Sequence, residues 1–330
     1  MSRRVRDVDD LVLRAQQGQA RAVARLISLV EDGAAELREV ASALAPYTGR
    51  AQVVGITGPP GVGKSTSTNV LVTALRAAGK KVGVLAVDPS SPFSGGALLG
   101  DRVRMQDHAL DGGVFIRSMA TRGHLGGIAW ATPQALRVLD AAGCDVVLVE
   151  TVGVGQSEVA VVSLADTTLV LLAPGMGDGI QAAKAGILEV ADVFVVNKAD
   201  RDGADQTVRD LKYMISLGRR EQEGPRWRPP IVRTVANRAE GLDDLVGAIE
   251  EHRSWMVTHG ELDARRQRRA EAEIEAIALE QLRERFGDVR RGGGEPGSSA
   301  GGLSGLAKRV VAGELDPYRA ADKLLAELGV

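Results

Sequence analysis

Hydrophobic positions divide the chain into a helical start, a long alternating middle and a polar, helical end. Between residues 51 and about 255, short runs rich in Val, Leu and Ile alternate with segments of helical periodicity. Six of these runs are predicted strands: 51–57, 82–87, 145–150, 167–173, 192–197 and 230–236. Runs this uniformly apolar are typical of parallel strands that are covered on both faces. The alternation therefore predicts a doubly wound α/β domain with a mostly parallel sheet.

Helices are predicted before this region, over residues 6–45. Apolar residues there recur at helical spacing (Leu37, Val40, Ala41 and Leu44), and Pro46 closes the segment. We therefore expect an N-terminal helical segment over 1–50 and a nucleotide-binding domain over 51–257.

A C-terminal arm is predicted over 258–330. In 261–286 an apolar stripe runs among interleaved Arg and Glu residues, a pattern that favours a solvated helix face over a nucleic-acid patch. The glycine-rich stretch 287–305 has the composition of a flexible linker, and two short helices follow over 306–311 and 317–328. Such a tail is too small to form a core alone, so we expect it to pack on the main domain or on another subunit.

Composition narrows the class of protein. The net charge of −2 gives no basic field for nucleic acid or an anionic membrane, and aromatic residues make up only 3%, so the core is aliphatic. The single cysteine, Cys144, cannot form an intramolecular disulfide and is expected to be a reduced structural thiol. The charged N-terminus has no secretory pattern, and no apolar run approaches the ~20 residues of a membrane span, so we expect a soluble cytoplasmic protein.

The strongest chemical signal is the stretch Gly58-Pro-Pro-Gly-Val-Gly-Lys-Ser65, which fits G-x-x-x-x-G-K-[ST] between a predicted strand and a predicted helix. In such a loop, backbone N–H groups and the helix N-terminus bind a polyphosphate. Lys64 is expected to reach the β and γ phosphates and Ser65 to ligate Mg²⁺. The expected nucleotide contacts in this loop are Gly58, Gly61, Val62, Gly63, Lys64, Ser65 and Thr66. The pattern predicts binding of a nucleoside triphosphate.

A second motif points to guanine. Asn197-Lys198-Ala199-Asp200 follows a predicted strand and fits [NT]-K-x-D, in which the Asp carboxylate accepts hydrogen bonds from guanine N1 and the exocyclic amine. Adenine lacks this donor pair, so the motif predicts GTP over ATP. The segment Thr234-Val235-Ala236 ends the next strand, where it could present a backbone N–H to guanine O6.

Acidic residues at the ends of predicted strands form a candidate magnesium site. Asp88 and Glu150 each close an apolar strand, and Asp101 follows in Gly100-Asp101-Arg102. Mg²⁺ prefers oxygen ligands and is usually held by one or two carboxylates together with phosphates. We expect Ser65, Asp88, Asp101 and Glu150 to supply them, directly or through water.

Hydrolysis is expected to be slow without a partner. The segment Glu150-Thr-Val-Gly153 resembles the D-x-x-G element of G proteins, with Gly153 near the nucleotide, but Val154 stands where Ras-type proteins carry a water-positioning Gln. Gln156, Glu158 and Asp101 remain candidates for that role. The expected catalytic residues are Lys64, Asp101 and Glu150.

Three long segments resemble the MeaB/ArgK family, which includes the human protein MMAA. They are Asp88–Met105, Arg117–Gly127 and Glu150–Glu158, and the likeness extends to the tail at 313–322. These relatives are G-protein chaperones of adenosylcobalamin-dependent methylmalonyl-CoA mutase and related enzymes. The resemblance implies a SIMIBI-class G domain, a homodimer formed through C-terminal helices, and GTP hydrolysis that gates cobalamin loading and protects or reactivates the mutase.

The resemblance also assigns residues and partners. It places the family's magnesium and catalytic acids at Asp88, Asp101 and Glu150, and a mobile switch segment at 174–184 that includes Asp178, Gln181 and Lys184. A cobalamin adenosyltransferase is a further partner it suggests. Some SIMIBI relatives have an extra lysine early in the phosphate loop, but Pro59 and Pro60 stand in that region here, which puts hydrolysis by that device in doubt.

Several alternatives stay open at the level of sequence. The client could be methylmalonyl-CoA, 2-hydroxyisobutyryl-CoA, isobutyryl-CoA or ethylmalonyl-CoA mutase. The chain has no D-x-H-x-x-G cobalamin motif, so it is expected to serve the cofactor enzyme without carrying cobalamin itself. A nucleotide-dependent kinase associated with basic amino-acid transport is the main alternative. A nickel-inserting GTPase would need clustered His or Cys ligands, and the chain has four His, one Cys and no clustered pair.

Overall fold

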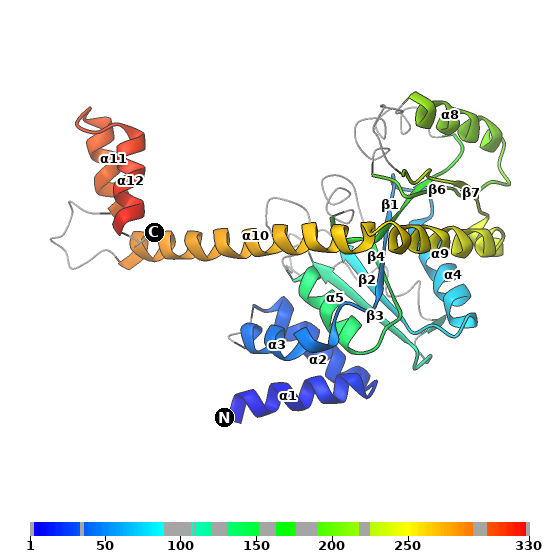
Figure 1. Ribbon diagram of the computed structural model, residues 1–330, viewed down its shortest axis with the longest axis horizontal. Helices are drawn as coiled ribbons and strands as arrows, with labels where there is room; N and C mark the ends of the chain where they lie inside the picture. Colours follow the sequence, from blue (N-terminus) through cyan, green and yellow to red (C-terminus); the bar gives the residue numbers. More distant parts are fainter. Residues whose placement is uncertain are drawn as a thin grey trace. The chain divides into compact units, whose positions relative to one another are not determined.

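The computed structural model describes residues 3–33, 36–88, 107–108, 110–120, 131–151, 163–175, 190–217, 225–292 and 302–327. The chain forms two compact units, Met1–Asp263 and Ala264–Val330. The first unit contains the sheet and the candidate site, and Figure 1 labels most of its helices and strands.

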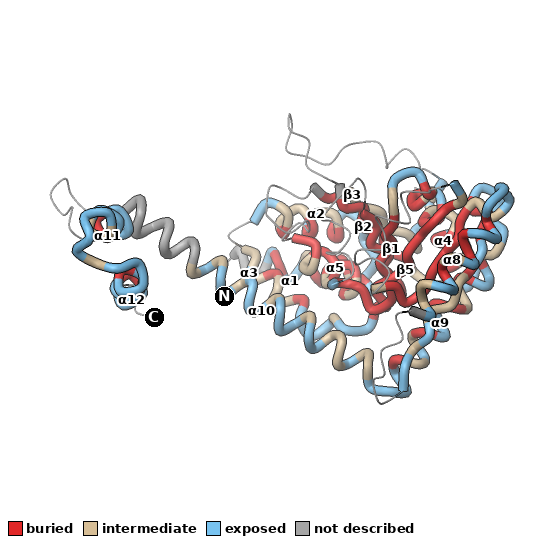
Figure 2. Tube along the Cα trace, turned by 90° about the horizontal axis from the view of Figure 1, so that it is seen from above, coloured by how far each residue is buried: buried red, intermediate tan, exposed pale blue. Residues whose placement is uncertain are grey.

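A seven-stranded sheet forms the centre of the first unit, and every strand pairing in it is parallel. Its strand order is β3-β2-β4-β1-β5-β6-β7. The strands are β1 (Gln52–Thr57), β2 (Val82–Asp88), β3 (Val114–Ala120), β4 (Val146–Thr151), β5 (Thr167–Leu172), β6 (Val193–Val196) and β7 (Ile231–Arg233). All residues of β1, β4, β5 and β6 are buried, and Figure 2 shows β1 and β5 in red. The predicted doubly wound parallel sheet is confirmed.

Helices cover both faces of the sheet. On one face α4 (Lys64–Ala77) and α9 (Leu242–Thr258) share a hydrophobic cluster with alternate residues of β1, β4, β5 and β6. On the other face lie α5 (Thr132–Ala141) and α8 (Ala204–Leu217). The helix α5 shares a hydrophobic cluster with residues of β1, β2 and β4 that point to this face, and α8 shares one with residues of β5 and β6. Burial on both faces explains why these strands read as continuous apolar runs instead of alternating ones.

The N-terminal helices belong to the same core. They are α1 (Arg3–Gln16), α2 (Ala20–Glu31) and α3 (Leu37–Leu44), followed by the short 3-10 helix η1 (Ala45–Tyr47). Their apolar faces share one buried cluster with α5, β2 and β4, including Leu26, Ile27 and Leu44. Figure 1 shows α2 and α3 beside α5.

The strand β3 was not predicted from the sequence. It pairs with β2 at the edge of the sheet, in the register Val82↔Val114 to Asp88↔Ala120. Its polar residue Arg117 donates hydrogen bonds to Glu31 and Ser28 of α2, so a charged side chain in a strand is satisfied by a helix far away in the sequence. The edge strand is thereby also tied to the N-terminal helices.

The C-terminal end is more helical than its composition predicted. The helix α10 runs from Glu261 to Gly292, so residues 287–292 of the expected linker continue a helix. At the far end α11 (Gly302–Val311) begins inside the expected linker, and α12 (Pro317–Glu327) follows. Consecutive glycines, which disfavour a helix, begin only at Gly292. The isolated Gly287 does not end the helix, so the linker was predicted to start too early. In the second unit α11 and α12 form a small cluster around Leu306, Ala320 and Leu324. None of the helices described here is both long and apolar enough to cross a membrane.

Candidate functional site

The phosphate loop predicted from the sequence joins β1 to α4, with Thr57 as the last strand residue and Lys64 as the first helical one. Three of its glycines, Gly58, Gly61 and Gly63, have φ values of 141°, 78° and 95°. At Gly58 a Cβ atom would lie 2.3 Å from the backbone oxygen of Leu171. At Gly63 it would lie 2.6 Å from the side-chain nitrogen of Asn197. The loop therefore needs glycine at these two positions for space as well as for conformation.

Lys64 is buried against the loop that precedes it. Its Nζ atom donates hydrogen bonds to the backbone oxygens of Gly58, at 2.8 Å, and Pro59, at 3.3 Å. The lysine is 8% exposed and stands at the first position of α4, where the helix dipole adds partial positive charge. The helix N-terminus and the ammonium group together place positive charge at the end of β1, which is an arrangement that suits an anion.

Ser65 and Glu150 are brought together across two elements. The Ser65 hydroxyl donates a 2.6 Å hydrogen bond to Glu150 Oε1, and Glu150 is 1% exposed near the end of β4. Strand pairing explains the meeting, because β4 is a direct neighbour of β1 and Ile56 is paired with Glu150. The structure therefore joins two of the four residues expected to serve a magnesium ion.

Of the other predicted acids, Asp88 is described through its backbone. It ends β2, one residue past the pair Val87↔Thr151, so it lies at the same edge of the sheet as the end of β4. Asp101 and Gly153 lie outside the described residues, as do the switch residues Asp178, Gln181 and Lys184. Within the described part of the chain, no three His, Cys, Asp or Glu side chains gather as a metal site. The Ser65–Glu150 pair would thus need phosphate oxygens and further ligands to complete an oxygen shell.

Asn197 connects the phosphate loop to the second motif. Its side-chain nitrogen donates a 2.8 Å hydrogen bond to the backbone oxygen of Val62. Its side-chain oxygen accepts hydrogen bonds from the Thr234 hydroxyl, at 3.2 Å, and the backbone N–H of Ala236, at 3.1 Å. Asn197 is 2% exposed, so these bonds form in a buried setting where an unpaired amide would be costly. One side chain thus fixes three segments that are distant in sequence.

The neighbouring Lys198 makes a further contact with the phosphate loop. It has a positive φ of 56°, unusual for a residue other than glycine, and its Nζ donates to the backbone oxygen of Gly61 at 2.6 Å. Residues with such an unusual backbone conformation are often found at functional sites, and this one contacts the phosphate loop.

The predicted contact of Thr234-Val235-Ala236 with guanine stays a prediction, and the structure shows which groups their backbone N–H donors bond. The backbone N–H groups of these residues donate to Val196, Glu240 and the Asn197 side chain, in that order. Buried N–H groups are nearly always paired, and here each finds its partner within the protein. A contact with guanine O6 would require one of these N–H groups to exchange its partner, and the segment lies against Asn197.

Asp200 is held by a residue that sequence reasoning did not single out. Its Oδ2 atom lies 2.8 Å from Nη2 of Arg238, and the Nε atom of Arg238 lies 3.5 Å from Glu240 Oε1. Arg238 ends the 3-10 helix η4 (Ala236–Arg238). In the sequence, Arg238 is marked only by being a basic residue two positions after the predicted guanine segment 234–236.

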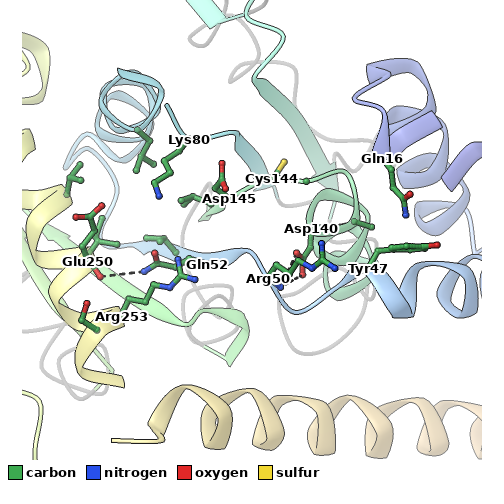
Figure 3. A pocket seen from close by; sticks show the side chains of 18 residues that line it. Gln16, Tyr47, Arg50, Gln52, Lys80, Asp140, Cys144, Asp145, Glu250 and Arg253 are labelled. Carbon is green, nitrogen blue, oxygen red and sulfur yellow. Dashed lines mark hydrogen bonds between the residues drawn. The ribbon is translucent and has the colours of Figure 1, made fainter. Parts of the chain in front are cut away.

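A cavity of about 800 Å³ opens at the amino ends of the strands, at the other end of the sheet from the phosphate loop (Figure 3). It is lined by residues near the amino ends of β1 and β4, among them Gln52, Cys144 and Asp145, whereas the phosphate loop follows the carboxyl end of β1. The carboxylate of Asp140, in the wall of the cavity, accepts hydrogen bonds from the backbone N–H groups of Gly49 and Ala51. This side chain therefore holds the segment that precedes β1. Acidic and basic side chains both line this cavity, and its lining includes none of the phosphate-loop residues 58–65.

Comparison with known proteins places the chain in a family. Residues 23–290 match the family described as "Methylmalonyl Co-A mutase-associated GTPase MeaB". A protein of Pyrococcus abyssi that is named as a GTPase is 48% identical over 321 residues, covering 97% of both chains. The "Methylmalonic aciduria type A homolog, mitochondrial" of Mus musculus is 36% identical and covers 97% of this chain and 79% of its own.

A further relative is named ArgK, and a solved structure is described as a transport system kinase. The "GTPase ArgK" of Escherichia coli is 37% identical over 264 residues, covering 78% of this chain and 80% of its own. A solved structure described as "Crystal structure of LAO/AO transport system kinase" is 26% identical, with a TM-score of 0.69, and covers 100% of this chain and 99% of that one. On the family match and these identities, the chain belongs to the MeaB family of GTPases.

Proposed function

We propose that this protein binds GTP at the edge formed by the phosphate loop, Glu150 and the Asn197–Asp200 segment, and hydrolyses it. The observation that carries the proposal is the bond from Asn197 to the backbone oxygen of Val62. It fixes the predicted guanine-reading segment to the predicted phosphate loop, so one nucleotide can engage both. A phosphate-binding loop alone would serve any triphosphate, whereas the attached Asp200 offers acceptors that suit guanine.

The chain's own groups divide the work in this proposal. The loop N–H groups and the N-terminus of α4 bind phosphate oxygens, and Lys64 exchanges its carbonyl partners for the β and γ phosphates. The chemistry of Ser65 and Glu150 suits Mg²⁺, which would neutralise charge on the phosphates when bound. Glu150 holds the Ser65 hydroxyl in place, and Asp88 and Asp101 are proposed as additional oxygen donors.

Slow intrinsic turnover is part of the proposal. Phosphoryl transfer needs a water held in line with the leaving group, and Val154 cannot orient one through a side-chain hydrogen bond. The remaining candidates, Asp101, Gln156 and Glu158, lie outside the described residues. A partner or a second subunit would complete the site and accelerate hydrolysis.

We further propose that the partner is an adenosylcobalamin-dependent acyl-CoA mutase, whose cofactor loading the GTPase cycle gates. Support comes from the family description, which names a mutase-associated GTPase, and from the mouse relative named for methylmalonic aciduria. The switch segment with Asp178, Gln181 and Lys184 would relay the nucleotide state to the mutase, and a cobalamin adenosyltransferase would supply the cofactor. Methylmalonyl-CoA mutase is the first client to test, ahead of 2-hydroxyisobutyryl-CoA and other acyl-CoA mutases.

A homodimer formed through the C-terminal helices belongs to the same proposal. In α10 the apolar residues Ile274 and Leu279 are 65% and 46% exposed, and in α12 Tyr318 is 84% exposed. Apolar side chains left in water along a helix are expected to be covered by another surface. Light scattering of the purified full-length chain would show a mass of twice 34.7 kDa if this is right.

The alternative of a kinase linked to basic amino-acid transport rests on the name of one related structure, the transport system kinase. A kinase would transfer the γ-phosphate to a protein acceptor, whereas a GTPase releases it as inorganic phosphate. Radiolabelled γ-phosphate distinguishes the two by whether label ends on protein or in solution.

The primary experiment measures GTP turnover by the purified protein, alone and with an acyl-CoA mutase, with ATP as the control nucleotide. Slow release of phosphate from GTP, accelerated by the mutase and absent with ATP, would support both parts of the proposal. Turnover of GTP without stimulation by any mutase would retain the GTPase and reject the proposed client. Equal use of ATP would reject the guanine assignment.

A further inference from the structure

We infer that Arg238 positions the Asp200 carboxylate for guanine and is therefore a specificity-determining residue of the nucleotide site. The inference rests on the proposed function, because it takes Asp200 as the residue that reads the base. Arg238 Nη2 lies 2.8 Å from Asp200 Oδ2, and this ion pair joins η4 to the loop after β6.

Asp200 needs such support because its surroundings give it little else. It follows Lys198, whose backbone is in the left-handed region, and its side chain is 38% exposed. Val235, in the opposite segment, has no side-chain hydrogen-bonding group. Across the part of the chain that the structure describes, Arg238 is the one charged partner of the Asp200 carboxylate. Without it, the carboxylate would sample several rotamers and lose that freedom only on binding.

The ion pair leaves Asp200 able to read a base. An ionised carboxylate has about four acceptor positions on its two oxygens, and the single contact from Arg238 occupies one of them. Guanine N1–H and its exocyclic amine would use two more. Only the ionised form of a carboxylate accepts on both oxygens.

The same short helix holds both ends of the guanine motif. Asn197, at the start, accepts the backbone N–H of Ala236, and Asp200, at the end, is paired with Arg238. Glu240 Oε1 also lies 3.5 Å from the Nε atom of Arg238, so two carboxylates face the guanidinium. The motif is thus attached to η4 at two points, and Arg238 supplies the point nearest the expected base.

The test compares binding of GTP and ITP, which lacks the exocyclic amine, to the full-length wild type and Arg238→Ala. An exposed ion pair has a modest strength, so we expect the GTP-over-ITP affinity ratio to fall about two- to fivefold. Arg238→Lys keeps the charge and should restore part of the ratio. An unchanged ratio in Arg238→Ala would overturn the inference. Tighter GTP binding in that variant would also overturn it, because Arg238 would then be a competitor of guanine.

Two further variants separate this inference from the proposed function. Arg233→Ala is the control, because it breaks a similar surface ion pair: Arg233 Nη1 lies 2.7 Å from Asp205 Oδ1, and both side chains are at least half exposed. This variant should leave the GTP-over-ITP affinity ratio unchanged. Asp200→Asn should weaken the preference for GTP more than Arg238→Ala does. If Asp200→Asn changes the ratio and Arg238→Ala does not, only the role of Arg238 fails. If neither does, the guanine assignment fails as well.

Discussion

The Ser65 hydroxyl donates a 2.6 Å hydrogen bond to the Glu150 carboxylate, from the first turn of α4 to the end of β4. Both residues are buried, so the pair is set before any ligand arrives. The oxygen atoms of this pair are of the kind that Mg²⁺ prefers, which is why we propose them as ligands together with the phosphates.

Glu150→Gln should therefore weaken the magnesium-dependent part of GTP binding by roughly 10- to 100-fold. The amide keeps the shape of the side chain but loses the charge that supports the ion. GTP affinity measured with Mg²⁺ and with EDTA separates this effect from a general loss of binding, since the EDTA value should change little. A drop of equal size under both conditions would show that Glu150 supports the fold of the loop instead.

Lys64→Ala should abolish tight GTP binding without unfolding the protein. The ammonium group contacts carbonyls of the phosphate loop, and a charge-assisted bond to phosphate contributes ~1.5–3 kcal/mol, or roughly 10- to 100-fold in affinity. Lys80→Ala is the matched control, because it removes the same charge near the cavity at the amino ends of the strands. Wild-type affinity in Lys64→Ala would reject the phosphate-loop assignment.

Alanine substitutions in the loop should rank by the space around each glycine. Gly58→Ala would bring a Cβ to 2.3 Å from a backbone oxygen, and Gly63→Ala would bring one to 2.6 Å from the Asn197 side chain, so both should lose GTP binding. Gly61→Ala meets no atom within 4 Å and suffers only the left-handed backbone cost of about 1–2 kcal/mol. Chemical denaturation and nucleotide titration of the three variants test this order, which equal losses at all three positions would contradict.

Local sequence patterns could predict most of the nucleotide edge, because its parts follow buried strands. The loop glycines, Ser65, Glu150 and Asn197 each stand just after or at the end of a continuous apolar run. In a parallel sheet the carboxyl ends of all strands lie on the same side, so these residues could be expected to meet there even without knowing the strand order.

Features that depend on contacts distant in sequence were not predictable in this way. The edge strand β3 contains Arg117, and its partner Glu31 lies 86 residues earlier, so no local pattern explains a charged residue there. The pairing of Asp200 with Arg238, and the capture of the Ala236 N–H by Asn197, likewise depend on how two loops meet. Composition alone also placed the linker too early, because α10 continues to Gly292.

Asn197→Ala should reduce both stability and GTP binding. The substitution leaves the Val62 oxygen and the Ala236 N–H without their buried partner, and each such loss costs about 1–3 kcal/mol. Thr234→Val is the control, since it removes only the hydroxyl that donates to the Asn197 oxygen at 3.2 Å and should cost about 1 kcal/mol. Denaturant unfolding gives both values, and equal costs would show that the link to the phosphate loop adds nothing.

Cys144 gives a prediction about pH that does not involve the nucleotide. Burial raises the pKa of its thiol from 9.0 to about 12, and the nearby carboxylates of Asp140 and Asp145 add to the rise while Lys81 opposes it. The folded protein therefore holds this proton more tightly than the unfolded chain does. The contribution to stability is full below pH 9 and is lost as the pH rises from about 9 through about 12, because the unfolded thiol ionises first.

Unfolding free energy measured at pH 8 and pH 10.5 should therefore fall more in the wild type than in Cys144→Ala. The limiting slope for one group is ~1.4 kcal/mol per pH unit, and the measured difference should approach that value between about pH 9.5 and 10.5. Thiol reagents at pH 8 should label Cys144 much more slowly in the native than in the denatured protein, since the protonated, largely buried sulfur is a poor nucleophile. Rapid labelling of the native protein, or identical pH profiles for the two proteins, would mean that the thiol is accessible to water.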